Sequence, residues 1–365
     1  MFNNVYRNKK VIVTGHTGFK GTWLTQWLKI LGAEVMGISD GIPTNPSMFE
    51  TLNIESEIDH RIIDIRDCGQ LARAIQEFHP DYVFHLAAQA IVSTSYADPL
   101  NTISTNVLGT AHVLDALRKL TKPCIAVIIT SDKCYENVEW EWGYRETDHL
   151  GGKDIYSASK GAAELVFHAY FHSFLKNCPD IRIASARAGN VIGGGDWAKD
   201  RIIADAVRSW NNGLPVQIRS PEATRPWQHV LEPLSGYLWL GASLVTDAKL
   251  NGESFNFGPR AEQNRRVVEL IADVFQHWNK DFVSYQITDN VPFHEAGLLK
   301  LNCDKALFHL RWEPTLFYEE CVQMVGEWYA GYYSQDQDVK SLTSKQILQY
   351  MDSAKKRSNR WTQLN

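Results

Sequence analysis

Two short segments of the chain carry side chains that can move protons. In TSDKCY, Ser131, Asp132 and Lys133 follow an apolar, β-branched run that is typical of a buried strand. In YSASK, Tyr156 and Lys160 stand four residues apart, so they share one face of a predicted helix. A hydroxyl, a carboxyl, a phenol and two amines are the kinds of group used in general acid–base catalysis. These five residues are therefore the candidate catalytic set.

Tyr156 is the candidate base, for an electrostatic reason. A phenol has an ordinary pKa of about 10, and a neighbouring ammonium favours its phenolate form. Lys160 would supply that charge to Tyr156 as a base, and Ser131 would share a hydrogen bond with the same oxygen. The spacing Tyr-x-x-x-Lys is by itself common on helix surfaces. Its combination in chain order with Ser131 and with a glycine-rich loop favours the catalytic interpretation.

The glycine-rich loop lies near the start of the chain. VIVTGHTGFKG places Gly15, Gly18 and Gly21 directly after a predicted strand and at the opening of a predicted helix. Such a turn lets the backbone approach a pyrophosphate, and the helix N-terminus offers unpaired N–H groups to the anion. The segment therefore predicts a dinucleotide site. The same loop adds Thr17, Phe19 and Lys20 to the predicted cofactor contacts.

A carboxylate favours NAD over NADP. Asp40 ends the second predicted strand, where it would accept hydrogen bonds from the adenosine ribose and repel a 2′-phosphate. The alternative is a surface aspartate in a turn. The other predicted cofactor contacts follow later strands and helices: Asp64, Ile65, Leu86, Ala87, Ala88, Gln89 and Asn106, beside Tyr156 and Lys160 themselves. For Asp64 the alternative is a helix cap.

The elements that must position these residues alternate along the first half of the chain. Strand-like runs alternate with helical patterns over 71–78, 101–120 and 156–176. This rhythm predicts an α/β fold, a Rossmann-type doubly wound parallel sheet with a smaller C-terminal α/β substrate lobe. We expect an NAD-binding domain over 1–190, to which some later segments return, and a mainly substrate-binding lobe over 191–335. The polar tail over 336–365 is expected to be loosely ordered.

Composition narrows the class of protein further. The 365 residues include 44% hydrophobic and 22% charged residues, as in ordinary globular proteins, and the net charge of −5 does not favour a nucleic-acid partner. The six cysteines form no CxxC pair, the start of the chain lacks a signal-peptide pattern, and no run approaches the roughly 20 apolar residues of a membrane span. These features predict a cytoplasmic protein. His168 and His172 have the spacing of a zinc pair but lack the HExxH glutamate and a third ligand, so no metal is predicted.

Across most of its length the chain resembles the extended short-chain dehydrogenase/reductases and, within them, the nucleotide-sugar 4,6-dehydratases. The later motifs are the most specific, because the wider family shares the earlier ones. The resemblance is carried by VTGHTGFKG, TSDKCYEN, WGYRE, YSASKGAAEL, ARAGNVIGGGDW, RPWQHVLEPLSGYLWL and FNFGPR.

The resemblance implies a redox-neutral elimination on CDP-glucose that yields CDP-4-keto-6-deoxyglucose and water, in deoxysugar biosynthesis, with NAD as a catalytic cofactor. Tyr156 would take the proton of the sugar C4 hydroxyl with help from Ser131, while Lys160 tunes it and holds the nicotinamide ribose. Asp132 would protonate the leaving C6 hydroxyl. Relatives that act on dTDP-glucose carry glutamate where Lys133 stands. Lys133 would therefore either take the C5 proton as a neutral amine or stabilise the enolate as a cation.

Substrate contacts are implied in the second half of the chain. Asn190 follows the sixth predicted strand, and Arg225 in RPWQHV would grip the diphosphate, with Arg201 and Arg208 as helpers. The resemblance also implies a homodimer or homotetramer, with the apolar positions of the segments 106–117 and 156–176 as its seam. One alternative is a sugar epimerase, which has no need of Asp132 and Lys133. Another is a non-catalytic NAD-binding regulator, which needs no serine–tyrosine–lysine set.

Overall fold

The protein is described by a computed structural model. The part of the chain that it describes comprises residues 1–260, 262–278, 284–288 and 298–363.

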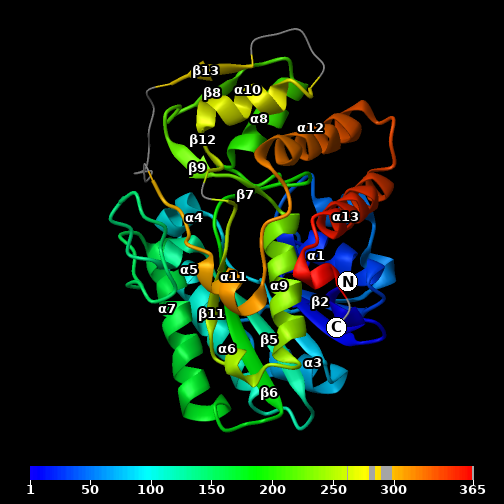
Figure 1. Ribbon diagram of the computed structural model, residues 1–365, viewed down its shortest axis with the longest axis vertical. Helices are drawn as coiled ribbons and strands as arrows, with labels where there is room; N and C mark the ends of the chain where they lie inside the picture. Colours follow the sequence, from blue (N-terminus) through cyan, green and yellow to red (C-terminus); the bar gives the residue numbers. More distant parts are fainter. Residues whose placement is uncertain (261, 279–283, 289–297, 364–365) are drawn as a thin grey trace.

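A parallel sheet of seven strands forms the centre of the molecule (Figure 1). Every pair of neighbouring strands in it is parallel, which confirms the predicted Rossmann-type fold. The edge strand β11 comes from the second half of the chain, so part of that half returns to the sheet. In spatial order the strands are β11 (Ser254–Phe257), β6 (Ile181–Ala188), β5 (Cys124–Ile129), β4 (Tyr82–His85), β1 (Lys10–Thr14), β2 (Glu34–Ser39) and β3 (Asp59–Ile62).

Helices cover both faces of the sheet, which explains why its inner strands β1, β4 and β5 are largely apolar on both sides. In β1, Val11 and Val13 belong to one buried cluster while Ile12 belongs to the other, because successive side chains point to opposite faces. On one face, α1 (Phe19–Ile30) and α9 (Leu231–Leu244) lie against the sheet, and α2 (Met48–Leu52) and α13 (Val339–Lys356) pack on α1; the other face is covered by α3 (Cys68–Phe78), α6 (Gly109–Leu117) and α7 (Ile155–Tyr170). Beyond the sheet, α12 (Tyr318–Ser334) packs between α13 and α10 (Val267–Phe275).

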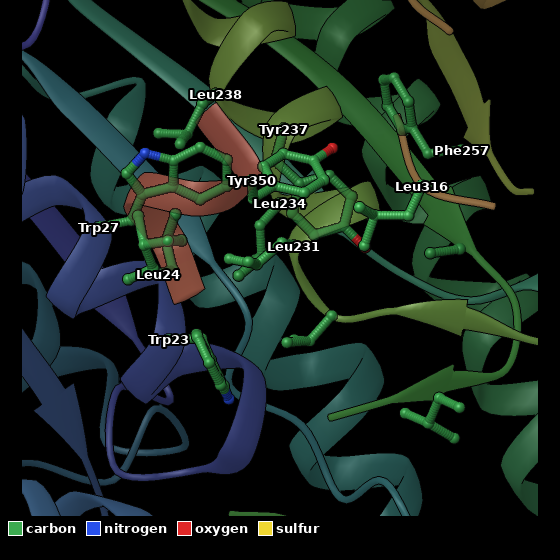
Figure 2. Close-up of a cluster of buried hydrophobic side chains, with 14 of the residues drawn as sticks. Trp23, Leu24, Trp27, Leu231, Leu234, Tyr237, Leu238, Phe257, Leu316 and Tyr350 are labelled. Carbon is green, nitrogen blue, oxygen red and sulfur yellow. The ribbon is translucent and has the colours of Figure 1, made fainter. Parts of the chain in front are cut away.

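The C-terminal helix packs onto the N-terminal half of the chain. Figure 2 shows Trp27 of α1, Leu231 and Leu234 of α9 and Tyr350 of α13 in one cluster. Ile347 and Tyr350 are fully buried, while the exposed face of α13 is polar apart from Leu348. The expectation of a loosely ordered tail was therefore wrong, since a surface helix needs only one apolar stripe to dock and its average composition hides that stripe.

The helix predicted over 101–120 is interrupted. It divides into α5 (Pro99–Ile103), a π-helical turn (Ser104–Leu108) and α6. Asn106 lies in the π-helical turn, and its side-chain amide is hydrogen-bonded to the backbone of Gln89 and to Ser159. A π-helical turn re-aims side chains, and here it turns the Asn106 amide toward Gln89, which follows β4.

A smaller group of elements lies beyond one end of the sheet, at the top of Figure 1. Its strands pair in twos, β8 with β13 and β9 with β12, while β7 pairs with β10. Among the described residues, no helix has the length and apolar character needed to cross a membrane. The remaining elements are α4 (Val92–Ala97), β7 (Val191–Ile192), α8 (Ile202–Asn211), β8 (Val216–Ile218), β9 (Thr224–Pro226), β10 (Gln228–His229), β12 (Asn264–Arg266), β13 (Tyr285–Ile287) and α11 (Asp304–Leu310).

Candidate active site

A cavity of about 1450 Å³ opens at the carboxyl ends of the central strands. Residues that follow β1, β4, β5 and β6 line it, as expected for open parallel sheets. A site for one drug-sized ligand occupies about 300–1,000 Å³. The cavity is therefore large enough for two ligands to lie side by side.

The glycine-rich loop forms one wall of this cavity. Gly15 has φ +74°, and a Cβ there would lie 2.7 Å from the backbone nitrogen of Ala87. A Cβ on Gly21 would lie 2.0 Å from the carbonyl oxygen of Gly15. Both positions therefore require glycine, and the loop closes tightly under the start of α1. Gly18, which lies between these two glycines, is the N-cap of that helix. Its neighbours Thr17, Phe19 and Lys20 also line the cavity.

The first turn after β2 continues the same wall. Asp40 is exposed at the cavity, and the Thr17 hydroxyl donates a hydrogen bond of 2.7 Å to the carbonyl of Gly41. The turn is thereby tied to the glycine loop. The residues predicted after the third and fourth strands that also line the cavity are Ile65, Leu86, Ala87, Ala88 and Gln89.

Two predicted cofactor contacts do not line the cavity. Asp64 is held by Arg66, with the guanidinium Nη2 at 2.6 Å from Oδ2. Asn106 is buried, and its amide accepts a 2.8 Å hydrogen bond from the Gln89 N–H and donates one of 2.8 Å to Ser159. Asn106 supports the cavity wall from behind through these bonds, and Asp64 is paired with its neighbouring arginine. Direct contact of either residue with a cofactor stays a prediction.

The candidate catalytic residues converge on the cavity from two elements. Ser131, Asp132 and Lys133 follow β5, whereas Tyr156 and Lys160 lie in the first half of α7, and all five line the cavity. The Ser131 hydroxyl donates a 2.9 Å hydrogen bond to Oδ1 of Asp132. The predicted set is thus brought together in space.

Glycine makes room for the carboxyl of Asp132. A Cβ on Gly189, which follows β6, would lie 3.2 Å from Oδ2 of Asp132. Asp132 is 4% exposed, so its carboxyl has little freedom to move away from a larger residue. Sequence reasoning assigned Gly189 no role, although it stands inside the motif ARAGN.

Burial is the largest influence on the pKa values of Tyr156 and Lys160, the two titratable cavity residues of α7. It raises the pKa of Tyr156, while the charge of Arg201 and a hydrogen bond with Ser131 act in the opposite direction. In the protein without a cofactor, the raised pKa therefore favours the phenol form of Tyr156. Burial also lowers the pKa of Lys160 to about 8 and, with the help of Arg201, that of Lys20 to about 8.

The predicted substrate residues line the opposite part of the cavity. Asn190 follows β6, and Arg225 lies in β9 with Nη1 donating to the Thr224 carbonyl at 2.9 Å. Arg201, at the N-cap of α8, is exposed. Arg208 lines the cavity but donates a 2.6 Å hydrogen bond to the Trp197 carbonyl and pairs with Asp205.

Three functional candidates escaped sequence reasoning. Asp196 of the GGGDW motif lines the cavity, and burial raises the pKa of its carboxyl although Arg201 opposes the shift. Glu164 and Arg187 form a fully buried ion pair behind the catalytic residues. The motif marks Asp196, but no local pattern marks the ion pair, since its partners lie on different elements.

The two predicted histidines lie away from the cavity lining. His168 of α7 has Nε2 at 3.4 Å from the hydroxyl of Ser254, and His172 is exposed. Their i, i+4 spacing therefore reflects their places on a helix.

Fold and site together define a dinucleotide-binding protein of the Rossmann class with a tyrosine–lysine pair at its cavity. The model of the GDP-mannose 4,6 dehydratase family matches residues 12–325. The chain belongs to this family. A CDP-glucose 4,6-dehydratase of Salmonella typhimurium is 44% identical over 354 residues, which cover 96% of this chain and 98% of that protein.

Solved structures of lower identity share the fold. An epimerase from Methanothermobacter thermautotrophicus has a TM-score of 0.77 at 24% identity and covers 92% of this chain and 96% of its own. The dTDP-glucose 4,6-dehydratase of Streptomyces venezuelae has a TM-score of 0.74 at 21% identity and covers 91% of this chain and 100% of its own.

Proposed function

We propose that this protein is an NAD-dependent 4,6-dehydratase that converts CDP-glucose to CDP-4-keto-6-deoxyglucose and water. The observation that carries the proposal is the convergence of Tyr156, Asp132 and Lys133 on one cavity beside the glycine-rich loop. The Salmonella typhimurium relative, whose name states this activity, supports the choice of nucleotide sugar.

The residues of the first cavity wall fit NAD. Gly15 and Gly21 leave backbone where any side chain would collide, and the free start of α1 faces the cavity, as a pyrophosphate requires. Asp40 stands at the end of β2, where a carboxylate accepts the ribose hydroxyls. When bound, NAD supplies a reversible two-electron acceptor, so that the hexose is oxidised at C4 and re-reduced at C6 without net consumption of the cofactor.

The protein's own groups handle the protons. Tyr156 takes the proton of the C4 hydroxyl, and Ser131 steadies the oxygen of the developing carbonyl. Asp132 gives a proton to the C6 oxygen, which leaves as water. Lys133 either takes the C5 proton as a neutral amine or, as a cation, stabilises the enolate.

Three arginines and one asparagine at the cavity are the proposed substrate-binding residues. Arg225 and Asn190 would hold the diphosphate and sugar, with Arg201 and Arg208 at the edge of the same space. In domain terms, residues 1–190 with β11 would bind the dinucleotide and residues 191–335 mainly the nucleotide sugar.

A homodimer or homotetramer is part of the proposal. An apolar face outside α5 and α7 exposes four side chains strongly: Leu100 (78%), Leu165 (61%), Leu108 (53%) and Phe174 (52%). Exposed apolar clusters of this kind mark association surfaces. We also place the protein in the cytoplasm, because all six cysteines are free thiols.

A substrate panel tests the activity. Purified protein with NAD is incubated separately with CDP-glucose, dTDP-glucose, GDP-mannose and UDP-glucose, and the products are weighed by mass spectrometry. Loss of one water from CDP-glucose alone, without net reduction of NAD, supports the proposal. A product of unchanged mass would identify an epimerase instead, and no product from any sugar would leave the dehydratase assignment wrong.

A further inference from the structure

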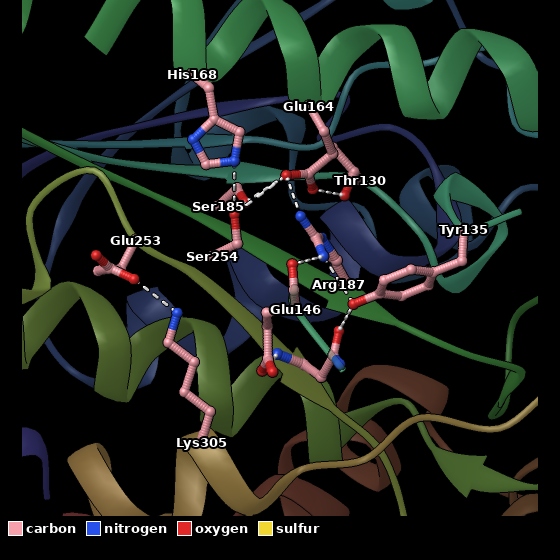
Figure 3. A network of polar contacts seen from close by, with 11 residues as sticks. Thr130, Tyr135, Glu146, Glu164, His168, Ser185, Arg187, Glu253, Ser254 and Lys305 are labelled. Atoms are coloured by element: carbon pink, nitrogen blue, oxygen red, sulfur yellow. Dashed lines mark hydrogen bonds and ion pairs between the residues drawn. The ribbon is translucent and has the colours of Figure 1, made fainter. Parts of the chain in front are cut away.

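Glu164 and Arg187 form a buried ion pair at the centre of a polar network (Figure 3). Arg187 Nη2 is 2.8 Å from Oε2 of Glu164, and both side chains are 0% exposed. Burying two charges costs free energy that only good geometry and further hydrogen bonds offset. Those bonds are present: the Ser185 hydroxyl donates to Oε2 at 2.9 Å and the Thr130 hydroxyl donates to Oε1. With Arg187 and these donors, the pKa of Glu164 falls to about 2, against the effect of burial.

The carboxylate belongs to the catalytic helix. Tyr156, Lys160 and Glu164 follow one another at intervals of four residues along α7, so they lie on one face. The first two line the cavity, and the third reaches beneath it to the sheet. Whatever holds Glu164 therefore sets the rotation and height of the tyrosine and lysine.

The same ion pair also contacts both ends of the catalytic segment 131–133. Thr130, which immediately precedes the segment, donates to Glu164. Tyr135, just beyond it, accepts a 2.7 Å hydrogen bond from Arg187 Nη1, and its ring lies 5.0 Å from the guanidinium carbon. The Tyr135 hydroxyl in turn donates to Asn256 of β11 at 2.8 Å. One salt bridge thus joins the two pieces of chain that carry the candidate catalytic residues.

Close packing leaves these two pieces little other freedom. A Cβ on Gly161 of α7 would lie 3.1 Å from the Gly151 nitrogen and 3.2 Å from the Cys134 carbonyl oxygen. The helix therefore touches the backbone that follows Ser131, Asp132 and Lys133. Packing contact limits how closely α7 and the segment 131–133 approach each other. The hydrogen bonds and ion pair of Glu164 and Arg187 determine how far one is shifted along the other.

We propose that Glu164 and Arg187 are positioning residues that hold the Tyr156–Lys160 helix in register with the Ser131–Asp132–Lys133 segment. The reaction whose rate they govern is the one proposed above, so this inference rests on that function. A misplacement of about 1 Å between reacting groups costs about 100-fold in rate. The pair acts on kcat and leaves substrate binding unchanged, because neither residue lines the cavity.

The main test replaces both charges at once. Removing one partner would strand the other charge in the interior, whereas Glu164→Met with Arg187→Met keeps the volume without a buried charge. We expect a folded double variant whose kcat for CDP-glucose is about 100-fold lower, at unchanged KM. A double variant with the wild-type kcat would overturn the proposal.

Two single hydroxyl deletions provide a matched comparison that does not depend on the double variant folding. Thr130→Val and Ser185→Ala each remove one hydrogen bond to Glu164, but only Thr130 connects it to the catalytic segment. We expect a lower kcat for Thr130→Val, and a kcat close to wild type for Ser185→Ala. Equal effects of the two would mean that the network serves stability alone.

Amide hydrogen exchange separates this inference from the proposed activity. In the absence of any sugar, the double variant and Thr130→Val should lose protection in 130–135 and 156–164, with the rest of the sheet unchanged. Wild-type protein that fails to dehydrate CDP-glucose would refute the proposed function, and the exchange comparison would still judge the positioning role. Unchanged protection in both segments would refute that role.

Discussion

The ammonium of Lys160 lies 6.0 Å from the centre of the Tyr156 ring, one turn further along α7. Both side chains are buried, at 5% and 6% exposure. Burial lowers the pKa of the lysine to about 8 and raises that of the phenol above its ordinary value, so the two groups move apart in proton affinity and the lysine releases its proton first. While Lys160 keeps its charge, that charge favours the phenolate that could accept a proton from a substrate hydroxyl.

This pair predicts opposite effects of alkaline pH on activity and stability. Above about pH 8, Lys160 loses the charge that favours the phenolate, so kcat/KM should fall. Between pH 8 and the ordinary lysine pKa of 10.5, the folded protein binds fewer protons than the unfolded chain, so the free energy of unfolding should rise. Lys20, with its pKa also near 8, adds to the same rise. Activity profiles and urea titrations over this range test both signs, and an activity that climbs to pH 10 would contradict the first.

Asp132→Asn should separate oxidation of the sugar from elimination. The amide keeps the shape of the side chain beside Ser131 and Gly189 but has no acidic proton to transfer to the C6 oxygen. We expect product formation to slow by about 1,000-fold while reduced nicotinamide still forms in a single turnover. Stopped-flow absorbance checks this. If no reduced nicotinamide appears, Asp132 acts in the first step and its assignment is wrong.

Two substitutions of Lys133 distinguish its alternative roles. Arginine keeps a positive charge but does not become a neutral base, whereas methionine removes both properties. If Lys133 stabilises an enolate, Lys133→Arg should keep most of the activity and Lys133→Met should lose it. If Lys133 takes the C5 proton, both should fail about equally. Exchange of solvent deuterium into C5, followed by mass spectrometry, gives a second reading of the same step.

A buried carboxylate ties the C-terminal helix to the core. Glu232 of α9 accepts hydrogen bonds from the backbone N–H of Thr315 at 2.9 Å and from the Tyr350 hydroxyl at 2.8 Å. In Glu232→Gln an amide group would face these donors, so we expect the free energy of unfolding to fall by about 2 kcal/mol. The exposed Glu327→Gln is the control, and denaturant titration measures both. Equal stability of the two variants would show that the buried bonds are replaced at no cost.

The exposed apolar face predicts that association can be broken by charge. Leu165→Glu should shift the proteins to monomers, because a carboxylate would be buried at the seam. Leu348 on α13 is 53% exposed outside this face, and Leu348→Glu should keep the wild-type mass. Light scattering after gel filtration reports the mass of each. A monomeric wild type, or an unchanged mass of Leu165→Glu, would place the seam elsewhere.

Local patterns were sufficient for the fold class and for the residues that gather at the cavity. The glycine loop, the four-residue spacing of Tyr156 and Lys160, and the run that ends at Ser131 each depend on a few neighbouring residues. Turn conformation, helix periodicity and strand alternation act over that same short range, so they can be recognised in the sequence. Their meeting at one edge follows because parallel strands bring their carboxyl ends together.

Features that depend on contacts between residues far apart in the sequence were visible only in the tertiary structure. Asn106 faces a cavity wall from behind because of a π-helical turn, and Tyr350 docks α13 through a narrow stripe on a polar helix. Glu164 and Arg187 lie on a helix and a strand, and only the stacking of α7 on the sheet brings their charges to 2.8 Å. Burial also raises the pKa of Tyr156 against the opposing charge of Arg201. Desolvation and pairing depend on what surrounds a group in three dimensions, which no local spacing encodes.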